Sequence, residues 1–407
     1  MLDSILIGLS GMEGFSKGLK VISNNVANLN TAGFKSSTMQ FSDAYYQESG
    51  AGFDPVTGES TSFGSGLATS SSVIDFQAGE LQSSSNPLDT AINGDGYFVF
   101  QDKDGNAQAY TRDGQFEFDK DGVLVSATTG KYVMGYAASG AQDLTKITLD
   151  GLRSNAAKAT STVKFSGNLN STPASGATVA ETKIDSMVID DALGGQHTLK
   201  VDIVNDGTNA PNSWTVTVSD ATGTAIGNGT IGFIGGSPDP SADTVSIDYT
   251  PTGGTAMTLK LDFSSNVTSY VGDNLSSLSI ASQDGYGPGS ISGLSFDSDG
   301  KLSLAYSNGQ TAKGAQLALA HFDSNLELKQ ESGGQFQTDD PGNVHLGRAG
   351  SNGLGSIESG EIESSNVDLS NEFSNLIVMQ RGYQASSNVI STADQMLQQL
   401  FDLHGRG

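Results

Sequence analysis

Aspartates that directly precede a glycine recur along the chain, as in Asp121-Gly122, and their carboxylates are the first candidates for binding a metal ion. A calcium loop needs oxygen ligands at its first, third and fifth positions, glycine at its sixth and glutamate at its twelfth. With Gly122 at the sixth position the twelfth is Thr128, and with Gly300 there it is Tyr306. Because neither supplies a carboxylate, these pairs predict tight β-hairpin turns and no metal site.

No other spacing indicates catalysis or a cofactor. Gly94-Asp95-Gly96 lacks the third glycine and following helix of a dinucleotide fingerprint, and no Gly-Lys-Ser/Thr phosphate loop occurs. The absence of cysteine excludes thiol chemistry, and His197 and His321 lie in strand-like runs, where ordinary surface or core roles are expected. We therefore predict no catalytic residue, no cofactor, no metal and no enzymatic activity.

An amide cluster near the N-terminus is the remaining chemical feature: Asn24, Asn25, Asn28 and Asn30 fall within seven positions. Asparagine is a weak helix former unless its amide finds a partner, so a frayed helix end explains the first two poorly. Gly33 follows, where a left-handed residue could end the helix. We expect the first three amides to bond neighbouring copies or the segment after the helix.

These amides lie in the first of two predicted terminal helices. Apolar residues recur at spacings of three and four at both ends of the chain, and each end could form a helix of about 30 residues, roughly 45 Å long. The stripes comprise Leu2, Ile5, Leu9, Met12, Phe15, Leu19, Ile22, Val26 and Leu29 in one, and Leu369, Phe373, Leu376, Met379, Tyr383, Ile390, Ala393, Leu397 and Leu400 in the other.

Such stripes must be covered, either by pairing of the helices with each other or with further copies, or by docking on the body as ordinary surface helices. The small residues favour the first alternative. Glycine costs a helix about 1 kcal/mol relative to alanine but lets neighbours approach closely. The N-terminal helix carries Gly8, Gly11, Gly14 and Gly18.

Composition limits the possible partners. Among 407 residues, 45 acids and 20 bases give a net charge of −25, which disfavours binding to nucleic acid or anionic membranes. The start lacks the basic residues of a Sec signal, and no apolar run approaches the roughly 18 residues of a membrane span. We expect no membrane insertion, and secretion, if it occurs, without a cleaved signal.

The body between the helices predicts a mainly-β protein. Many short strands are indicated by the 52 glycines of the chain, by Asp-Gly and Asn-Gly pairs and by alternating apolar runs. The pairs lie at residues 93–96, 104–105, 113–114, 121–122, 206–207, 299–300 and 308–309, and the runs lie near 199–203, 214–218, 245–249 and 257–263. Residues 118–124 resemble residues 296–302, which suggests one domain split by another. We expect a multidomain chain: residues 1–33 with 361–407 as a terminal helical polymerisation domain, 34–72 as an extended connector, 73–146 with 283–360 as an inner split β domain, and 147–282 as an inserted outer β domain.

The ends and body resemble the bacterial flagellar rod and hook family of axial proteins. The resemblance lies in Ser10-Gly11-Met12, residues 22–28 (ISNNVAN), 31–35 (TAGFK), 91–98 (AINGDGYF), 110–116 (YTRDGQF), 363–369 (ESSNVDL), Gln380-Arg381, Tyr383 and residues 394–397 (DQML). Residues 190–199 (DDALGGQHTL), with Trp214 downstream, resemble the outer domain of hook proteins. In addition, the rod proteins of this family are generally shorter than this chain of 407 residues. The resemblance therefore favours hook over rod.

This resemblance implies a structural subunit that polymerises into the hook, the flexible universal joint between rod and filament in motility. It implies terminal coiled-coil segments, an extracellular place in the flagellar hook and basal body, and export by the flagellar type III apparatus. The implied partners are other copies, the hook cap protein, the distal rod and the hook-filament junction proteins. The alternatives are a distal rod or other axial protein, or a secreted β-rich adhesin or carbohydrate-binding module, which would not need two apolar terminal helices.

The residues expected to mediate assembly follow from the stripes, the amides and the resemblance. In the N-terminal segment they are Leu2, Ile5, Leu9, Met12, Leu19, Ile22, Asn24, Asn25, Val26, Asn28, Leu29, Gly33 and Phe34. In the C-terminal segment they are Asn366, Leu369, Phe373, Leu376, Gln380, Arg381, Tyr383, Ile390, Leu397 and Leu400.

Overall fold

A helix lies at each end of a mainly-β chain, as the sequence predicts. The computed structural model describes residues 2–44, 46–53, 60–64, 66–105, 108–172, 179–207, 212–272, 276–324 and 328–404. The chain forms two compact units: unit 1 comprises Met1–Leu149, Leu294–Ser303 and Lys313–Gly407, and unit 2 comprises Asp150–Gly293 and Leu304–Ala312.

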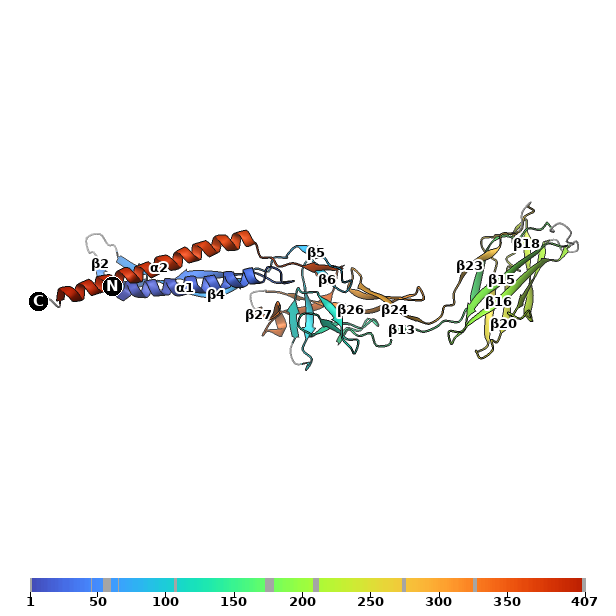
Figure 1. The fold of residues 1–407 in the computed structure, drawn as a ribbon, viewed down its shortest axis with the longest axis horizontal. Coiled ribbons are helices and arrows are strands. Elements are labelled where there is room, and N and C mark those ends of the chain that lie inside the picture. The colour runs from blue at the N-terminus through green and yellow to red at the C-terminus, as the bar shows by residue number, and fades with distance from the viewer. Residues whose placement is uncertain are drawn as a thin grey trace. The chain divides into compact units, whose positions relative to one another are not determined.

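In unit 1 the two helices run side by side in opposite directions, with both chain termini at the same end (Figure 1). Helix α1 spans Leu2–Ala27, 26 residues, and α2 spans Leu369–His404, 36 residues, so α1 is shorter and α2 longer than expected. The first turn of α2 is capped by Asp368, whose Oδ1 accepts from the backbone N–H groups of Ser370 and Asn371.

The predicted helix stop at Gly33 is wrong, because α1 already ends at Ala27. Gly33 does adopt a left-handed conformation, with φ +67°, but for a different reason. It packs on the loop after β8: a Cβ there would lie 2.5 Å from the backbone nitrogen of Asp113. Only glycine allows both this backbone conformation and this approach.

Residues after α1 form a hairpin that the sequence patterns did not predict. Strand β1 (Ser37–Asp43) pairs antiparallel with β4 (Leu67–Ile74), and β2 (Tyr46–Phe53) pairs with β3 (Ser60–Gly64). The β1–β4 pair lies along α1, where Leu67 N–H donates to Ser10 Oγ and the rings of Phe15 and Phe41 are 6.0 Å apart. One flank of α1 is therefore covered by the hairpin and another by α2.

The β part of unit 1 consists mainly of short antiparallel strands around aromatic side chains. In one sheet the strand order runs β26-β11-β7-β8-β28-β27, β29 also pairs with β26, and β6 with β30 and β5 with β31 form separate pairs. The strands are β5 (Leu81–Ser83), β6 (Thr90–Asn93), β7 (Tyr97–Gln101), β8 (Gln108–Thr111), β9 (Phe116–Phe118), β10 (Leu124–Ser126), β11 (Tyr132–Tyr136), β12 (Leu144–Lys146), β26 (Thr311–Phe322), β27 (Lys329–Glu331), β28 (Gln335–Gln337), β29 (Val344–Arg348), β30 (Ser356–Ser359) and β31 (Glu361–Glu363), with a 3-10 turn at Pro341–Asn343.

Unit 2 is a β-sandwich. One sheet has the order β15-β16-β17-β18-β19, and the other has β20-β21-β14-β22 with β23 also on β14. The strands are β13 (Ser154–Asn155), β14 (Thr162–Asn168), β15 (Glu181–Asp190), β16 (Gln196–Asn205), β17 (Ser213–Ser219), β18 (Ala225–Ile234), β19 (Ser237–Pro238), β20 (Thr244–Tyr249), β21 (Met257–Asp262), β22 (Val267–Thr268) and β23 (Ser279–Gln283), while β24 (Gly289–Phe296) and β25 (Lys301–Tyr306) contain residues of both units.

The four alternating apolar runs noted in the sequence lie on β16, β17, β20 and β21 and point into the sandwich core. Trp214 and Phe263 are fully buried there, and Phe165 stacks on Phe263 with ring centroids 4.5 Å apart. Period-two alternation places every second side chain on the inner face, which explains why these strands could be predicted.

The repeated Asp-Gly turns also form, and their acids have a structural role. Asp119 and Asp297 occupy equivalent positions in the two resembling segments: each carboxylate accepts the backbone N–H four residues on, from Val123 and Lys301, at 2.8 Å. Asp113-Gly114 is the exception, since Gly114 has no left-handed backbone. There glycine serves close packing instead, because a Cβ would lie 1.7 Å from the Thr90 carbonyl oxygen.

Candidate assembly interface

Glycine and other small residues line the contact between α1 and α2. Cβ atoms at Gly8 and Gly11 would lie 2.7 Å from Ile390 Cγ1 and 2.6 Å from Ser386 Oγ. Further along, a Cβ at Gly18 would meet Met379 at 3.0 Å. We call this contact the glycine seam; it confirms that the small residues allow close approach of a neighbouring helix, and that neighbour is α2 of the same chain.

The seam runs beside the predicted apolar stripe, so much of the stripe is left uncovered by the chain itself. The predicted assembly residues fall into three groups by exposure. The buried ones are Ile22, Asn25, Gly33 and Phe34, and the half-buried ones are Ile5, Met12, Leu19, Val26, Asn28, Leu29, Asn366, Leu376, Ile390 and Leu397. The exposed ones are Leu9, Asn24, Leu369, Phe373, Gln380, Arg381, Tyr383 and Leu400. Leu2 lies in α1, and its side chain is outside the described part of the chain.

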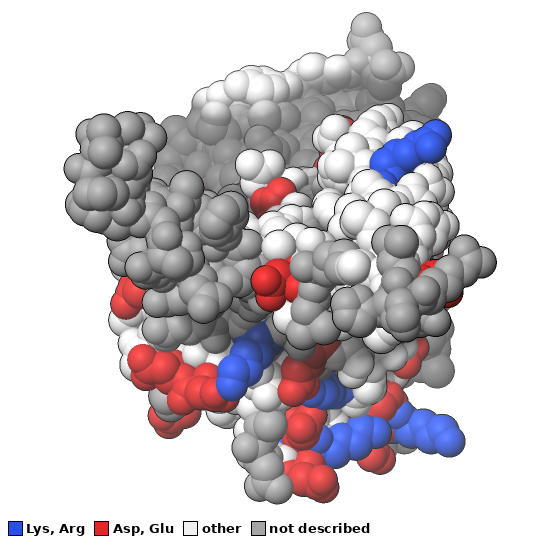
Figure 2. Space-filling model, turned by 90° about the vertical axis from the view of Figure 1, so that its left-hand side faces the viewer, with Lys and Arg blue, Asp and Glu red and all other residues white. Residues whose placement is uncertain are grey.

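Further exposed apolar side chains lie beside the stripe and were missed by the sequence analysis. On α2, Ile377, Val378 and Phe401 are 58%, 61% and 75% exposed, and on α1 Leu6 is 54% exposed. Viewed from the end that carries both termini, uncharged side chains make up most of the described surface in the upper part of the view, and most acids and bases lie in the lower part (Figure 2). The signal was in the sequence, since these residues neighbour the stripe, but strict spacings of three and four omitted them.

Asn25 joins α1, α2 and β1 through one fully buried amide. Its Nδ2 donates to the Ser37 carbonyl and to Glu372 Oε1, both at 2.8 Å, and its Oδ1 accepts the Ser37 N–H at 3.0 Å. The amide therefore bonds the segment after the helix, one of the two partners expected for it. Asn24 and Asn28 differ, because Asn28 Nδ2 donates to Asn24 Oδ1 at 3.2 Å in a local, more exposed pair.

A buried charge cluster, made of Lys35, Arg112 and Glu363, fixes the next part of the chain. Glu363 is completely buried; its Oε1 accepts from Lys35 Nζ at 2.6 Å and its Oε2 from Arg112 Nη1 at 3.3 Å. Gly79 N–H also donates to Oε1 at 2.9 Å. The three charged residues belong to three separate segments that carry the family resemblance, and the structure brings those segments together at one point.

Burial sets the electrostatics of this Glu363 cluster. Desolvation lowers the pKa of Lys35, although the neighbouring Glu363 carboxylate opposes the shift. Burial likewise raises the pKa of Tyr97, whose ring faces the Arg112 guanidinium, to about 12. Since removing the single carboxylate would leave two buried cations without a counter-charge, the cluster depends on Glu363.

Asn366 binds the same segments as the Glu363 cluster. We call Asn366 and this cluster together the buried junction. The Oδ1 of Asn366 accepts the Ser36 N–H at 2.7 Å, and its Nδ2 donates to the carbonyls of Asp75 and Gln77 at 2.9 and 3.0 Å. This amide was predicted as an assembly residue; in the structure its bonds are to segments of its own chain. The residues that follow α1 and precede α2 are thus held to one another before any second copy is considered.

The described residues contain no group of three or more histidine and acidic side chains placed to hold a metal ion. Within that same part of the chain, neither helix is long and apolar enough to cross a membrane. The structural features that describe this region are the glycine seam, the exposed apolar side chains and the buried junction.

Three family profiles match these regions. Residues 5–35 match "Flagella basal body rod protein", residues 91–171 match "Flagellar hook protein FlgE/F/G D1 domain", and residues 358–403 match "Flagellar basal body rod FlgEFG protein C-terminal". The first contains most of α1, and the last contains most of α2.

Whole-length relatives decide the family. The chain is 30% identical over 446 residues to flagellar hook protein FlgE of Borreliella burgdorferi, covering 99% of this chain and 100% of the relative. It is 32% identical over 417 residues to that of Salmonella typhimurium, covering 97% and 98%. The chain belongs to the flagellar hook protein family. A solved structure of Helicobacter pylori flagellar hook protein FlgE2 covers 70% of this chain and 100% of that one, with 16% identity and a TM-score of 0.49.

Membership confirms the hook prediction over the rod and adhesin alternatives. Flagellar hook proteins are structural subunits of the flagellum and not enzymes, which agrees with the prediction made from the sequence. Their place is the flagellar hook, outside the cell.

Proposed function

We propose that the chain polymerises through its terminal helices into the hook, the flexible joint that couples rod to filament. The observation that carries this proposal is the set of large apolar side chains that α1 and α2 leave exposed after they have paired with each other. At roughly 25 cal/mol per Å² of apolar surface, covering them offsets the entropy cost of ordering the ends. Further copies of the chain are the covering surface.

In this proposal, helices of several copies pack as coiled coils around the tube axis. The assembly residues are those predicted from the sequence, joined by exposed neighbours such as Ile377 and Val378. The four-part division of the chain, with the outer β domain of residues 147–282 inserted into the inner one, belongs to the same proposal. The acidic outer domains would then slide past one another as the tube rotates, since polar faces of like charge adhere weakly.

The partners belong to the proposal as well. They are the hook cap protein during growth, the distal rod below, the hook-filament junction proteins above and the type III apparatus that exports the chain. A chain without cysteine or disulfides is suited to export in an unfolded state.

A single introduced cysteine tests the proposal. Ala221 lies exposed in a turn of unit 2, beside Thr222, whose own side chain bonds Asp220 and is best left intact. Ala221→Cys should label with a membrane-impermeant thiol dye on intact, motile cells, as short spots at the bases of filaments. The cysteine-free parent chain is the control.

Two other patterns would contradict the proposal. Label along whole filaments would make the chain a filament subunit. Absence of surface label from motile cells that express the variant would place it in the rod instead.

A further inference from the structure

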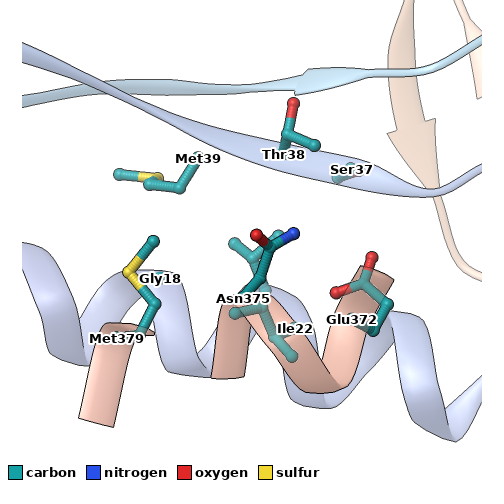
Figure 3. Close-up of a pocket in the computed structure, with 9 residues that line it drawn as sticks. Gly18, Ile22, Ser37, Thr38, Met39, Glu372, Asn375 and Met379 are labelled. Atoms are coloured by element: carbon teal, nitrogen blue, oxygen red, sulfur yellow. The ribbon is translucent and has the colours of Figure 1, made fainter. Parts of the chain in front are cut away.

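A hollow lies where α1, β1 and α2 meet, beside the glycine seam. Its volume is about 240 Å³, and the side chains that line it come from all three elements (Figure 3). The lining residues are Gly18, Val21 and Ile22 of α1, Ser37, Thr38 and Met39 of β1, and Glu372, Asn375 and Met379 of α2.

Glu372 gives this hollow its polarity. The residue is 7% exposed, and Oε1 accepts from Asn25 Nδ2 at 2.8 Å. The other oxygen, Oε2, is buried and has no hydrogen-bond partner among the described residues. A carboxylate oxygen left unsatisfied in a buried position is costly, so a donor that reached it would gain an interaction stronger than an ordinary surface contact.

The rest of the lining indicates what kind of donor fits. Val21, Ile22, Met39 and Met379 make an apolar wall, while the Asn375 amide lies between Glu372 and Met379 (Figure 3). An apolar wall that leads to a carboxylate suits a long aliphatic side chain with a cationic head. Arginine and lysine are the side chains of that chemistry.

Few basic residues near the helices are free to serve. Lys35 is committed to Glu363, and Lys17 pairs with Glu13 at 2.7 Å. Lys20 and Arg381 are both exposed. Arg381 is favoured because a guanidinium is more weakly hydrated than an ammonium group and suits desolvated ion pairs.

The position of Arg381 supports the same choice. It lies three and four residues after Val378 and Ile377, so it shares with them the uncovered apolar face of α2. A copy that covers that face would lie beside Arg381. In the single chain, Arg381 Nη1 makes only a long bond, 3.4 Å, to Gln384 Oε1 among its described contacts.

We propose that this hollow is a binding site for the Arg381 side chain of a second copy of the chain, and that the guanidinium donates to Oε2 of Glu372. The inference rests on the proposed polymerisation and adds one specific contact to it. The Asn25 amide holds the Glu372 carboxylate in place, so the hollow of one copy can bind the Arg381 side chain of the next.

A double-mutant cycle in isolated hooks tests the contact. Glu372→Gln and Arg381→Gln should each raise the subunit concentration in equilibrium with hooks roughly tenfold, the effect of losing one charged hydrogen bond. Because both changes remove the same contact, the double variant should be no worse than either single one. Lys20→Gln is the matched control and should leave the concentration unchanged.

Cysteine crosslinking gives a second measurement that does not depend on charge. Cells that co-express Asn375→Cys and Arg381→Cys chains, each with a single cysteine, should yield disulfide-linked dimers of the two chains in isolated hooks, because Asn375 lies in the hollow beside Glu372 (Figure 3). Asn375→Cys with Lys20→Cys should not. Any such bond must join two copies, since the natural chain has no cysteine.

The failures are distinguishable. Additive effects of the two glutamine variants, or crosslinking of residue 375 to residue 20 in place of residue 381, would overturn the Arg381 contact while hooks still formed. If the natural chain were absent from isolated hooks, the proposed function itself would fail.

Discussion

The sandwich of unit 2 and the helical end of unit 1 obtain their stability in different ways. In the sandwich, alternating strands bury Trp214, Phe165 and Phe263 almost completely within one chain. At the helical end, the two helices meet along glycines and leave large apolar side chains such as Phe401 exposed. The sandwich buries its core within a single copy, whereas the helical end is held at the buried junction and leaves large apolar side chains exposed.

A cavity in the sandwich should give the largest loss of stability. Phe165→Ala removes a stacked, buried ring and should cost unit 2 about 3–5 kcal/mol. The single tryptophan, Trp214, lies in the same core, so its fluorescence reports unfolding of unit 2 alone. We expect the fluorescence transition in urea to shift far to lower concentration while the helical far-UV signal is retained.

Lys164→Ala is the control, because Lys164 is exposed on the other face of β14. Loss of helical signal together with the fluorescence transition would contradict the view that the two regions are independently stabilised.

Breaking the buried junction should come next in size. Glu363→Gln leaves Lys35 and Arg112 buried without a counter-charge and should destabilise unit 1 by about 3 kcal/mol. The change should appear in the urea transition of the helical far-UV signal and leave the Trp214 transition in place. Glu361→Gln, on the same short strand but only partly buried, should change stability little. Equal effects of the two variants would show that the Glu363 cluster does not hold the junction.

Replacing the central amide tests whether the junction extends into the helices. Asn25→Leu leaves the Ser37 backbone groups and the Glu372 carboxylate unpaired, each at about 1–3 kcal/mol. We expect a total loss of at least about 3 kcal/mol in unit 1 and fewer hooks per cell, counted by electron microscopy. Asn24→Leu, which disrupts only the exposed pair with Asn28, is the matched control. Normal assembly of the Asn25 variant would make the amide dispensable.

A smaller effect should follow from filling the glycine seam. Gly8→Ala gains about 1 kcal/mol of helix propensity, but its Cβ meets Ile390 at 2.7 Å, an overpacking that typically costs 1–3 kcal/mol. We expect a net loss of about 1 kcal/mol for the paired helices, read from thermal unfolding by far-UV circular dichroism. Ser4→Ala on an exposed position should be neutral or stabilising. A stabilised Gly8 variant would mean that the seam is looser than described.

The same contrast explains how much could be predicted from the sequence. The alternation of apolar residues predicted β16, β17, β20 and β21, since local periodicity determines which side chains face a sandwich core. It could not predict the Glu363 cluster, because Lys35, Arg112 and Glu363 are far apart in the chain and no local period links them. For the helices, the apolar stripe was visible, but which face pairs within the chain depended on Gly8, Gly11 and Gly18.

The last effect, which depends on pH, concerns the acid stability of the sandwich. Burial alone would raise the pKa of Asp284, but hydrogen bonds from Thr162, Ser161 and Lys158 outweigh it and hold that pKa well below its ordinary value of 3.8. The folded state therefore binds this proton more weakly than the unfolded one, so the carboxylate stabilises unit 2 above pH 3.8 and the contribution is lost as pH falls below it. Asp284→Asn should cost about 1 kcal/mol at neutral pH and flatten the acid side of the stability curve, followed by Trp214 fluorescence, with the helical signal unaffected. Asp248→Asn serves as the exposed control, and an unchanged acid slope in the Asp284 variant would show that other carboxylates set the acid limit of this unit.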